Sequence, residues 1–389
     1  MISHSYLASI AKTVSQLASH GVYSLLDFHQ DEMSSEFGGE GFPKWAVETD
    51  GLKVKRYVFP LAYVESKALN RAFDHFWSDS KGPNSLGLQQ LYVSALEAVA
   101  RQFKGDPWVL GYDLFNEPWP AGATTQQLTA FYARAIEGIR SVDQHHLIWY
   151  EPWVTFNFGI PTGIPSFPDS GVGMSFHDYC LGTKGCAASE QHTVTNALAH
   201  STSTGVALLL TEFGATENYQ DLRNVVSLAD ANQLPWIEWS YCGCGDPTGT
   251  IPTSIEALVY KPNLPDTGTN VNRAKLKVLA EPYARVVAGT PLSYSFASTT
   301  GVFQLTYSTR APSGMQFGPG ACTAIEVPSI QYPTGYRVEV TGGRVFSATG
   351  AGVLEVRSTV SSGAVSVTIS RSTHGATGVS GPIPANCTA

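Results

Sequence analysis

Hydrophobic and polar positions alternate with two different periods along the first 290 residues. Apolar residues recur at helical spacing in residues 4–19, and a short buried strand is expected directly afterwards, at 22–28. The same succession of apolar strand and amphipathic helix then continues, with further strands expected at 109–115, 147–150, 172–176, 206–213 and 235–240. Strict alternation of this kind predicts parallel βαβ units.

The pattern changes near residue 289. A last helix is expected at 272–287, and helical periodicity disappears after Gly289. Residues 336–341 and 365–370 instead alternate between apolar and polar side chains, and Gly, Ser and Thr dominate the gaps, which predicts an antiparallel β-sandwich. We therefore predict an α/β chain with a (β/α)8 TIM barrel at 1–289, a C-terminal antiparallel β-sandwich at 290–371 and a polar tail at 372–389.

The predicted barrel has fewer strands than its fold requires. Only six strands are expected, whereas a closed (β/α)8 barrel has eight, and the chain opens on a helix that should follow a strand. A smaller open sheet would leave two buried parallel edges bare. We therefore expect the barrel to lack its first two strands, as in a truncated or fragmentary chain.

Two of the predicted strands end in a glutamate. The apolar run 109–115 leads into Asn116-Glu117-Pro118, and the run 206–210 leads into Thr211-Glu212. The carboxyl ends of barrel strands form the active face, so both carboxylates are expected at one rim. A pair of carboxylates indicates a glycosidase, in which one protonates the leaving oxygen and the other attacks the sugar carbon or activates water. The alternative to a catalytic role, for either glutamate considered alone, is a structural carboxylate that forms a salt bridge at the end of its strand.

Composition and charge narrow the classes of function. Hydrophobic residues make up 43% of the chain, which is ample for a core, and charged residues only 14%. The net charge is −8 with no Lys/Arg block, so a nucleic-acid partner is not expected. The six cysteines match no zinc spacing; Cys180 with Cys186 suits a disulfide, Cys242 and Cys244 could pair only with strain or reach other cysteines, and Cys322 and Cys387 lie in the C-terminal part.

Cysteine usage favours an oxidising compartment. No run is long enough to span a bilayer, and residues 1–20 lack the apolar stretch of a signal peptide. We expect a secreted or extracellular protein whose signal peptide was lost with the missing N-terminus, and a monomer. No metal or organic cofactor is implied, because carboxylates suffice for proton transfer and covalent catalysis.

The chain resembles glycoside hydrolase family five in the order and positions of several strand-end residues. These are His29, Asn116-Glu117-Pro118, His177-x-Tyr179, Glu212 and Trp239. Within the family it most resembles the endoglycoceramidases, through residues 27–31, the Gly-rich loop 37–45, residues 111–119 and 175–180, and the C-terminal stretch 332–343. The resemblance covers about residues 4–370.

This resemblance implies hydrolysis, with retention of configuration, of the bond between the oligosaccharide and the ceramide of a glycosphingolipid. It implies that Glu117 is the acid/base and Glu212 the nucleophile. By position, the resemblance also implies that Asn116 hydrogen-bonds to the 2-hydroxyl of the sugar and that His177 and Tyr179 orient the carboxylates. It further implies that His29 and Asp31 bind the sugar and that Trp239 stacks beneath it. Family barrels place other substrate contacts on the first two strands.

A substrate with a sugar head and a lipid tail needs a polar cleft that opens onto an apolar surface. We expect Phe37, Phe42 and Trp45, together with the loop 241–251, to form the lipid-facing side and to contact a membrane or micelle. Two alternatives remain open. One is an endo-β-glucanase or other β-glycanase acting on soluble glycans, and the other is a glycolipid-binding fragment without turnover. Glu151 could be a rim contact, and Asp113 is expected to be a buried structural carboxylate.

Overall fold

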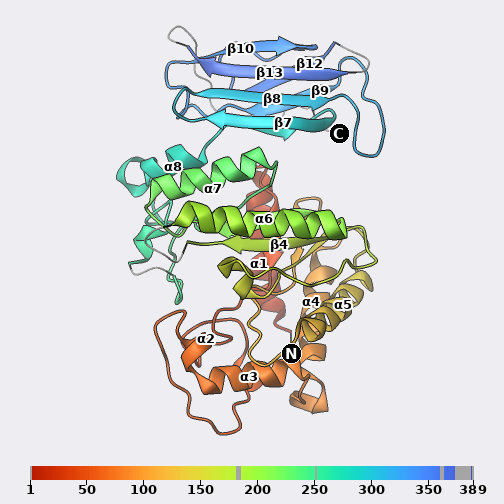
Figure 1. Cartoon of the computed structure of the whole chain (residues 1–389), viewed down its shortest axis with the longest axis vertical. Helices are drawn as coiled ribbons and strands as arrows, with labels where there is room; N and C mark the ends of the chain where they lie inside the picture. The colour runs from red at the N-terminus through yellow and green to blue at the C-terminus, as the bar shows by residue number, and fades with distance from the viewer. Residues whose placement is uncertain (1, 181–184, 250–251, 360–362, 373–386, 388–389) are drawn as a thin grey trace. The chain divides into compact units, whose positions relative to one another are not determined.

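The computed structural model describes residues 2–180, 185–249, 252–359, 363–372 and 387. Contacts divide the chain into two compact units. The first unit, called the catalytic unit below, comprises Met1–Ala215 and Ile237–Glu256, and the second comprises Thr216–Trp236 and Ala257–Ala389 (Figure 1). The predicted polar tail lies outside the described residues except for Ser372 and Cys387.

The catalytic unit contains a five-stranded parallel sheet of the TIM-barrel-like kind, with the strands in sequential order. Its strands are β1 (Ser24–Asp27), β2 (Val109–Asp113), β3 (Leu147–Tyr150), β4 (Val172–Asp178) and β5 (Leu208–Phe213). Five of the six predicted strands are thus confirmed. The sixth predicted stretch, at 235–240, does not form a regular strand. It does run parallel to β5, because the Ile237 N–H donates to the Leu210 carbonyl at 2.8 Å, the Trp239 N–H donates to the Phe213 carbonyl at 2.9 Å, and Gly214 and Trp239 form an isolated parallel bridge.

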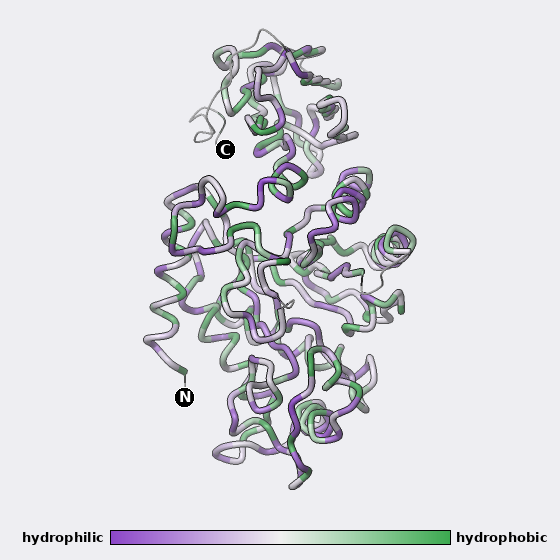
Figure 2. The backbone as a smooth tube through the Cα atoms, turned by 90° about the vertical axis from the view of Figure 1, so that its left-hand side faces the viewer, coloured by the Kyte–Doolittle hydropathy of each residue, from purple (hydrophilic) through white to green (hydrophobic). Residues whose placement is uncertain are grey.

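Helices connect the strands of the catalytic unit as the apolar spacing predicts. They are α1 (His4–Ser19), α2 (Ala62–Glu65), α3 (Lys67–Trp77), α4 (Leu88–Phe103), α5 (Thr125–Arg140) and α6 (Cys186–Thr204). Along α1, hydrophobic and hydrophilic residues alternate with the helical period (Figure 2). Polar caps define the helix starts: Thr124 and Gln127 form a capping box at α5, in which each side chain bonds to the backbone of the other.

The Gly-rich loop after β1 turns two of its three aromatic residues inward. Phe37 is fully buried, and the Phe42 ring packs against Phe76 and Phe115, with ring centroids 5.1 and 5.8 Å apart. The prediction that Phe37 and Phe42 face lipid is therefore wrong, because Phe37 is fully buried and Phe42 packs into an aromatic cluster under the loop. Only Trp45 remains exposed, at 51%.

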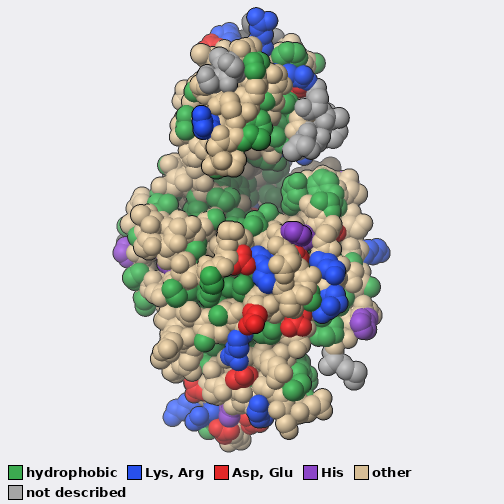
Figure 3. All heavy atoms as spheres, turned by 90° about the vertical axis from the view of Figure 1, so that its right-hand side faces the viewer, with side chains coloured by type: hydrophobic (Ala, Val, Ile, Leu, Met, Phe, Trp, Pro, Cys, Tyr) green, Lys and Arg blue, Asp and Glu red, His purple; other side chains and the backbone are tan. Residues whose placement is uncertain are grey.

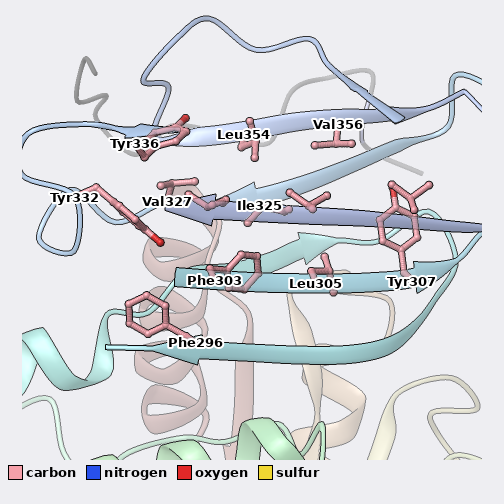
Figure 4. Packing of buried hydrophobic residues seen from close by; sticks show 13 residues of the cluster. Phe296, Phe303, Leu305, Tyr307, Ile325, Val327, Tyr332, Tyr336, Leu354 and Val356 are labelled. Atoms are coloured by element: carbon pink, nitrogen blue, oxygen red, sulfur yellow. The ribbon is translucent and has the colours of Figure 1, made fainter. Parts of the chain in front are cut away.

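Two antiparallel sheets form the core of the second unit. One has the order β10-β13-β8-β7 and the other β11-β12-β9-β6. The strands are β6 (Tyr283–Val286), β7 (Thr290–Ala297), β8 (Val302–Ser308), β9 (Cys322–Glu326), β10 (Tyr336–Thr341), β11 (Gly343–Val345), β12 (Val353–Ser358) and β13 (Ala364–Arg371). Their inward side chains, including Phe303, Leu305, Ile325 and Val356, form one buried cluster (Figure 4).

The predicted helix at 272–287 is wrong over its second half. The helix α8 covers only Arg273–Leu279, and β6 begins four residues later, after Pro282. Proline removes a backbone donor and disfavours a helical residue before it, which accounts for the break. The second unit also contains α7 (Tyr219–Ala231). The sandwich sheets thus begin before the boundary that we predicted near residue 290.

All six cysteines are paired. The disulfides join Cys180 to Cys186, Cys242 to Cys244 and Cys322 to Cys387. The first pairing confirms the prediction from sequence, and the second was one of its two alternatives. On the face drawn in Figure 3, acidic and basic side chains are interspersed. Among the described residues, no helix combines the length and the apolar character needed to cross a bilayer.

A carboxyl pair in the second unit predicts that its stability falls at alkaline pH. Burial raises the pKa of Asp230 on α7 to about 7 and that of Glu281 to about 9, and the two side chains share a hydrogen bond that requires a proton. Because both pKa values are higher in the folded state than in the unfolded chain, the pair stabilises the folded state fully at a pH below the ordinary carboxyl pKa. This stabilisation is lost as the pH rises through about 7 to about 9. We expect the melting temperature of this unit to be several degrees higher at pH 5 than at pH 9.5.

Asp230→Asn supplies the control for this pH dependence. Its amide oxygen still accepts from the protonated Glu281 carboxyl, and position 230 no longer titrates or repels Glu281, so the melting temperature should change less over the same range. Equal pH dependence in both proteins would contradict the role of this pair.

Candidate active site

Glu117 and Glu212 meet at the carboxyl end of the parallel sheet. The His177 ring at the end of β4 lies between them, with its Nδ1 2.8 Å from Glu117 Oε1 and 3.5 Å from Glu212 Oε2. The nearest carboxylate oxygens of the two glutamates and the ring nitrogen all lie within 4.8 Å of one another. This spacing is compatible with the carboxyl separation of about 5–5.5 Å found in retaining glycosidases and is shorter than the roughly 6.5–9.5 Å of inverting ones.

The backbone at Glu117 adopts an uncommon left-handed conformation, with φ of 41°. Two buried side chains hold it there. The Gln30 amide donates to the carbonyl oxygens of Asn116 and Glu117 at 2.9 and 3.0 Å, and the Glu117 N–H donates to Glu151 Oε2 at 3.0 Å. Such backbone strain persists only where the surroundings fix it, and it clusters at functional sites.

Glu151 is the acidic residue whose importance the sequence analysis underestimated. It follows β3, is almost fully buried, and places Oε1 3.3 Å from His177 Nε2. Burial raises the pKa of Glu151, and burial would by itself lower that of His177. The charges of Glu151 and Glu212 and the hydrogen bond to Glu117 overcome this effect, so the pKa of His177 lies well above its ordinary value. Glu151 follows a strand, as Glu117 does, and this position was the signal in the sequence that could have identified it as a site residue.

Glu212 has one neutral hydrogen-bond donor and two cationic neighbours. The Tyr179 hydroxyl donates to Glu212 Oε2 at 2.9 Å. Burial raises the pKa of Glu212 to about 8, while the charges of His177 and His29 act in the opposite direction. Three carboxyl groups therefore surround one imidazolium, and burial with mutual repulsion favours retention of a proton by the cluster.

A second group of predicted residues gathers beside this pair. His29 places Nδ1 2.7 Å from Asp27 and Nε2 3.1 Å from Asp31. Burial alone would lower the pKa of His29, but these hydrogen bonds raise it to about 12. The Trp239 ring stacks on the imidazole, with centroids 5.5 Å apart and planes 9° from parallel. One face of the half-buried Trp239 ring is thus occupied by His29.

Asp31 and Asn116 complete the predicted set. Asp31 accepts from the Thr248 hydroxyl at 2.9 Å, and burial raises the pKa of Asp31 to about 6. Asn116 donates to the Gln30 carbonyl at 3.0 Å, and its buried Oδ1 has no hydrogen-bond partner among the described residues. Asp113 is buried as predicted.

The structure thus brings all eight predicted site residues to one end of the sheet. Sequence reasoning missed the supporting roles of Gln30 and Glu151. It also missed a small cavity beside Glu117, which Trp153, Asn157 and His177 help to line. A doubly protonated imidazole offers no lone pair, so neither His177 nor His29 suits a metal ligand in this charge state.

Comparison with known families identifies the chain. The family description "Cellulase (glycosyl hydrolase family 5)" matches residues 1–245, and "Glycoside hydrolase family 5 C-terminal domain" matches residues 282–369. The chain belongs to glycoside hydrolase family 5. Membership makes it an O-glycosyl hydrolase by class, in keeping with its paired glutamates.

Relatives of this family 5 chain carry a narrower name. It is 29% identical to endoglycoceramidase I of Rhodococcus hoagii (strain 103S), over 98% of this chain and 76% of the relative. It is 26% identical to the endoglycoceramidase of Hydra vulgaris, over 87% of this chain and 68% of the relative.

Solved structures give the same result. Endo-glycoceramidase II from Rhodococcus sp. in its ganglioside GM3 complex is 27% identical, with a TM-score of 0.78 over 96% of this chain and 85% of that one. The same enzyme as a lactosyl-enzyme intermediate superposes with a TM-score of 0.77.

Proposed function

We propose that this chain hydrolyses the bond between the oligosaccharide and the ceramide of a glycosphingolipid, with retention of configuration. The observation that carries this proposal is the close pair Glu117 and Glu212 around His177, on a chain similar along nearly its whole length to endoglycoceramidases. The carboxyl spacing supports a covalent intermediate, since an inverting enzyme needs about 6.5–9.5 Å for a water.

In this mechanism Glu212 is the nucleophile and Glu117 the acid/base. Glu212 attacks the anomeric carbon as the Glu117 proton passes to the glycosidic oxygen, which breaks the bond to ceramide. Glu212 then carries the glycan as a neutral ester, so the carboxylate left on Glu117 no longer faces a second negative charge. Glu117 next takes a proton from water, and that water releases the glycan with its original configuration.

The surrounding polar residues support this cycle. The unpartnered Asn116 Oδ1 is placed to accept from the 2-hydroxyl of the sugar, a bond that strengthens as the ring flattens toward the oxocarbenium ion. Tyr179 and His177 orient the two carboxylates. His29 and Asp31 bind the sugar, and Trp239 stacks beneath it.

Incubation with lactosylceramide in detergent tests this function. The proposal predicts intact lactose and ceramide as the products. Release of glucose or galactose, or turnover of soluble cello-oligosaccharides alone, would contradict it. Turnover of soluble cello-oligosaccharides alone would favour the β-glucanase alternative, which is compatible with the family description "Cellulase".

We also propose that two further strands, together with β1 to β5 and the stretch 235–240 beside β5, complete an eight-stranded barrel. The outer edge of β1 has no strand partner among the described residues, and the sheet orders only β1 to β5. A bare buried edge of a parallel sheet is unfavourable. The three disulfides support an oxidising, extracellular location. A monomer that contacts a membrane or micelle would suit a lipid-linked substrate.

The Glu151→Gln substitution should lower kcat/KM by up to roughly 100-fold, since small misplacements of reacting groups have effects of this size. Glutamine keeps an oxygen for the Glu117 N–H but removes the charge that most raises the pKa of His177. The buried imidazolium should then lose its proton at a lower pH, and the alkaline limb of the kcat/KM profile should move to lower pH. A uniform loss at every pH would show that Glu151 acts only through packing.

A further inference from the structure

A run of exposed apolar side chains follows the Gly-rich loop. We call residues 52–64 the apolar-basic segment. Within it Val58, Leu61 and Val64 expose 67%, 53% and 74% of their surface, and Leu52 and Val54 are exposed as well. Single exposed apolar residues are ordinary, but a concentration of them marks a surface that binds something.

The charge of this region is opposite to that of the whole chain. Residues 44–71 contain six Lys or Arg against three Asp or Glu, whereas the chain has a net charge of −8. Lys53 and Lys55 are exposed, flank Val54, and have no recorded ion-pair partner among the described residues. Lysine side chains with apolar neighbours suit an interface in which apolar groups enter a lipid layer and the ammonium groups meet anionic headgroups.

Hydrogen bonds and ring contacts fasten the apolar-basic segment to the rim of the active site. The Arg56 guanidinium donates to the Ser35 carbonyl at 2.8 Å, and the Tyr63 hydroxyl accepts from the Glu32 N–H at 2.8 Å. The Tyr63 ring also packs on Trp119, two residues after Glu117, with centroids 5.1 Å apart. The segment is therefore held beside the end of the sheet that carries the catalytic glutamates.

We propose that the apolar-basic segment, together with Trp45, docks the protein on a lipid surface that carries anionic headgroups. This proposal rests on the proposed function, because a ceramide-linked substrate resides in such a surface. Docking through residues tied to the active-site rim would bring Glu117 and Glu212 to the level at which the glycan leaves the lipid. Charge complementarity selects an anionic layer over a neutral one, and the attraction should weaken with salt.

Sedimentation with vesicles that contain no glycolipid tests docking independently of catalysis. The protein should bind vesicles of phosphatidylcholine with about a third phosphatidylserine, and more weakly those of phosphatidylcholine alone. Lys53→Gln/Lys55→Gln should weaken binding to the anionic vesicles by roughly 25-fold, or about fivefold per lysine. Val58→Ser/Leu61→Ser/Val64→Ser should weaken binding to both kinds of vesicle.

Lys12→Gln/Lys104→Gln is the matched control, because both lysines are exposed on the catalytic unit outside the segment. It should bind like the native chain, and all variants should hydrolyse a soluble aryl β-lactoside at the native rate. Absence of binding to anionic vesicles, or an equal loss in the control pair, would overturn the proposal. Self-association that the triple serine variant abolishes would also overturn it, since the surface would then bind a second copy. Failure on the aryl lactoside with intact vesicle binding would count against the proposed function alone.

Discussion

Glu212→Gln should abolish turnover, with kcat falling by roughly 10⁴-fold or more. An amide is not a nucleophile at the anomeric carbon, so the glycosyl ester would not form. The glutamine oxygen still accepts from the Tyr179 hydroxyl, and the fold should be unaffected. The measurement is the initial rate on lactosylceramide and on an aryl β-lactoside, and both substrates should be affected because both require the same ester.

Glu217→Gln is a suitable control for this variant, since it makes the same chemical change at an exposed position five residues further on. Its rates should equal those of the native chain. If Glu212→Gln kept more than a few per cent of the native rate on either substrate, another group would have to be the nucleophile.

Glu117→Gln should have an effect that depends on the leaving group. Loss of general acid catalysis should slow release of ceramide by about 10²- to 10⁴-fold, because the departing alkoxide needs a proton. An aryl glycoside with a good leaving group needs little protonation, so its first step should survive. The second step still lacks a base, and a burst of phenol followed by slow turnover is expected.

Mass spectrometry during that burst should reveal the intermediate. The peptide that contains Glu212 should gain the mass of the sugar in Glu117→Gln, because deglycosylation has become slow. Equal losses on lactosylceramide and the aryl substrate, without a burst, would contradict the assignment of Glu117 as the acid/base.

Much of this site was predictable from periodicity and strand ends. The apolar pattern placed α1 and β3 at their observed bounds, because each buries one regular face. It placed Glu117 and Glu212 together because parallel strands end at one rim. The resemblance to a family then supplied His29, Asn116, His177, Tyr179 and Trp239, all of which lie at that rim.

What the sequence did not reveal depends on the direction of a side chain in irregular backbone. Phe37 and Phe42 lie in a loop with no period, so nothing local distinguishes a core-facing ring from an exposed one. The role of Glu151 depends on the left-handed backbone at Glu117, which only the folded structure shows. The 272–287 stretch has apolar residues compatible with a helix or a strand, and pairing with β9 decides in favour of a strand at 283–286.

Proton NMR of lactosylceramide hydrolysis, followed from the first minutes, tests the central claim most directly. One spectrum reports both the glycan that is released and the configuration of its new reducing end. The account predicts intact lactose that appears first as the β-anomer, with the α-anomer growing later by mutarotation. Lactose that appears first as the α-anomer would contradict the covalent role of Glu212, and monosaccharides in its place would contradict cleavage at the ceramide.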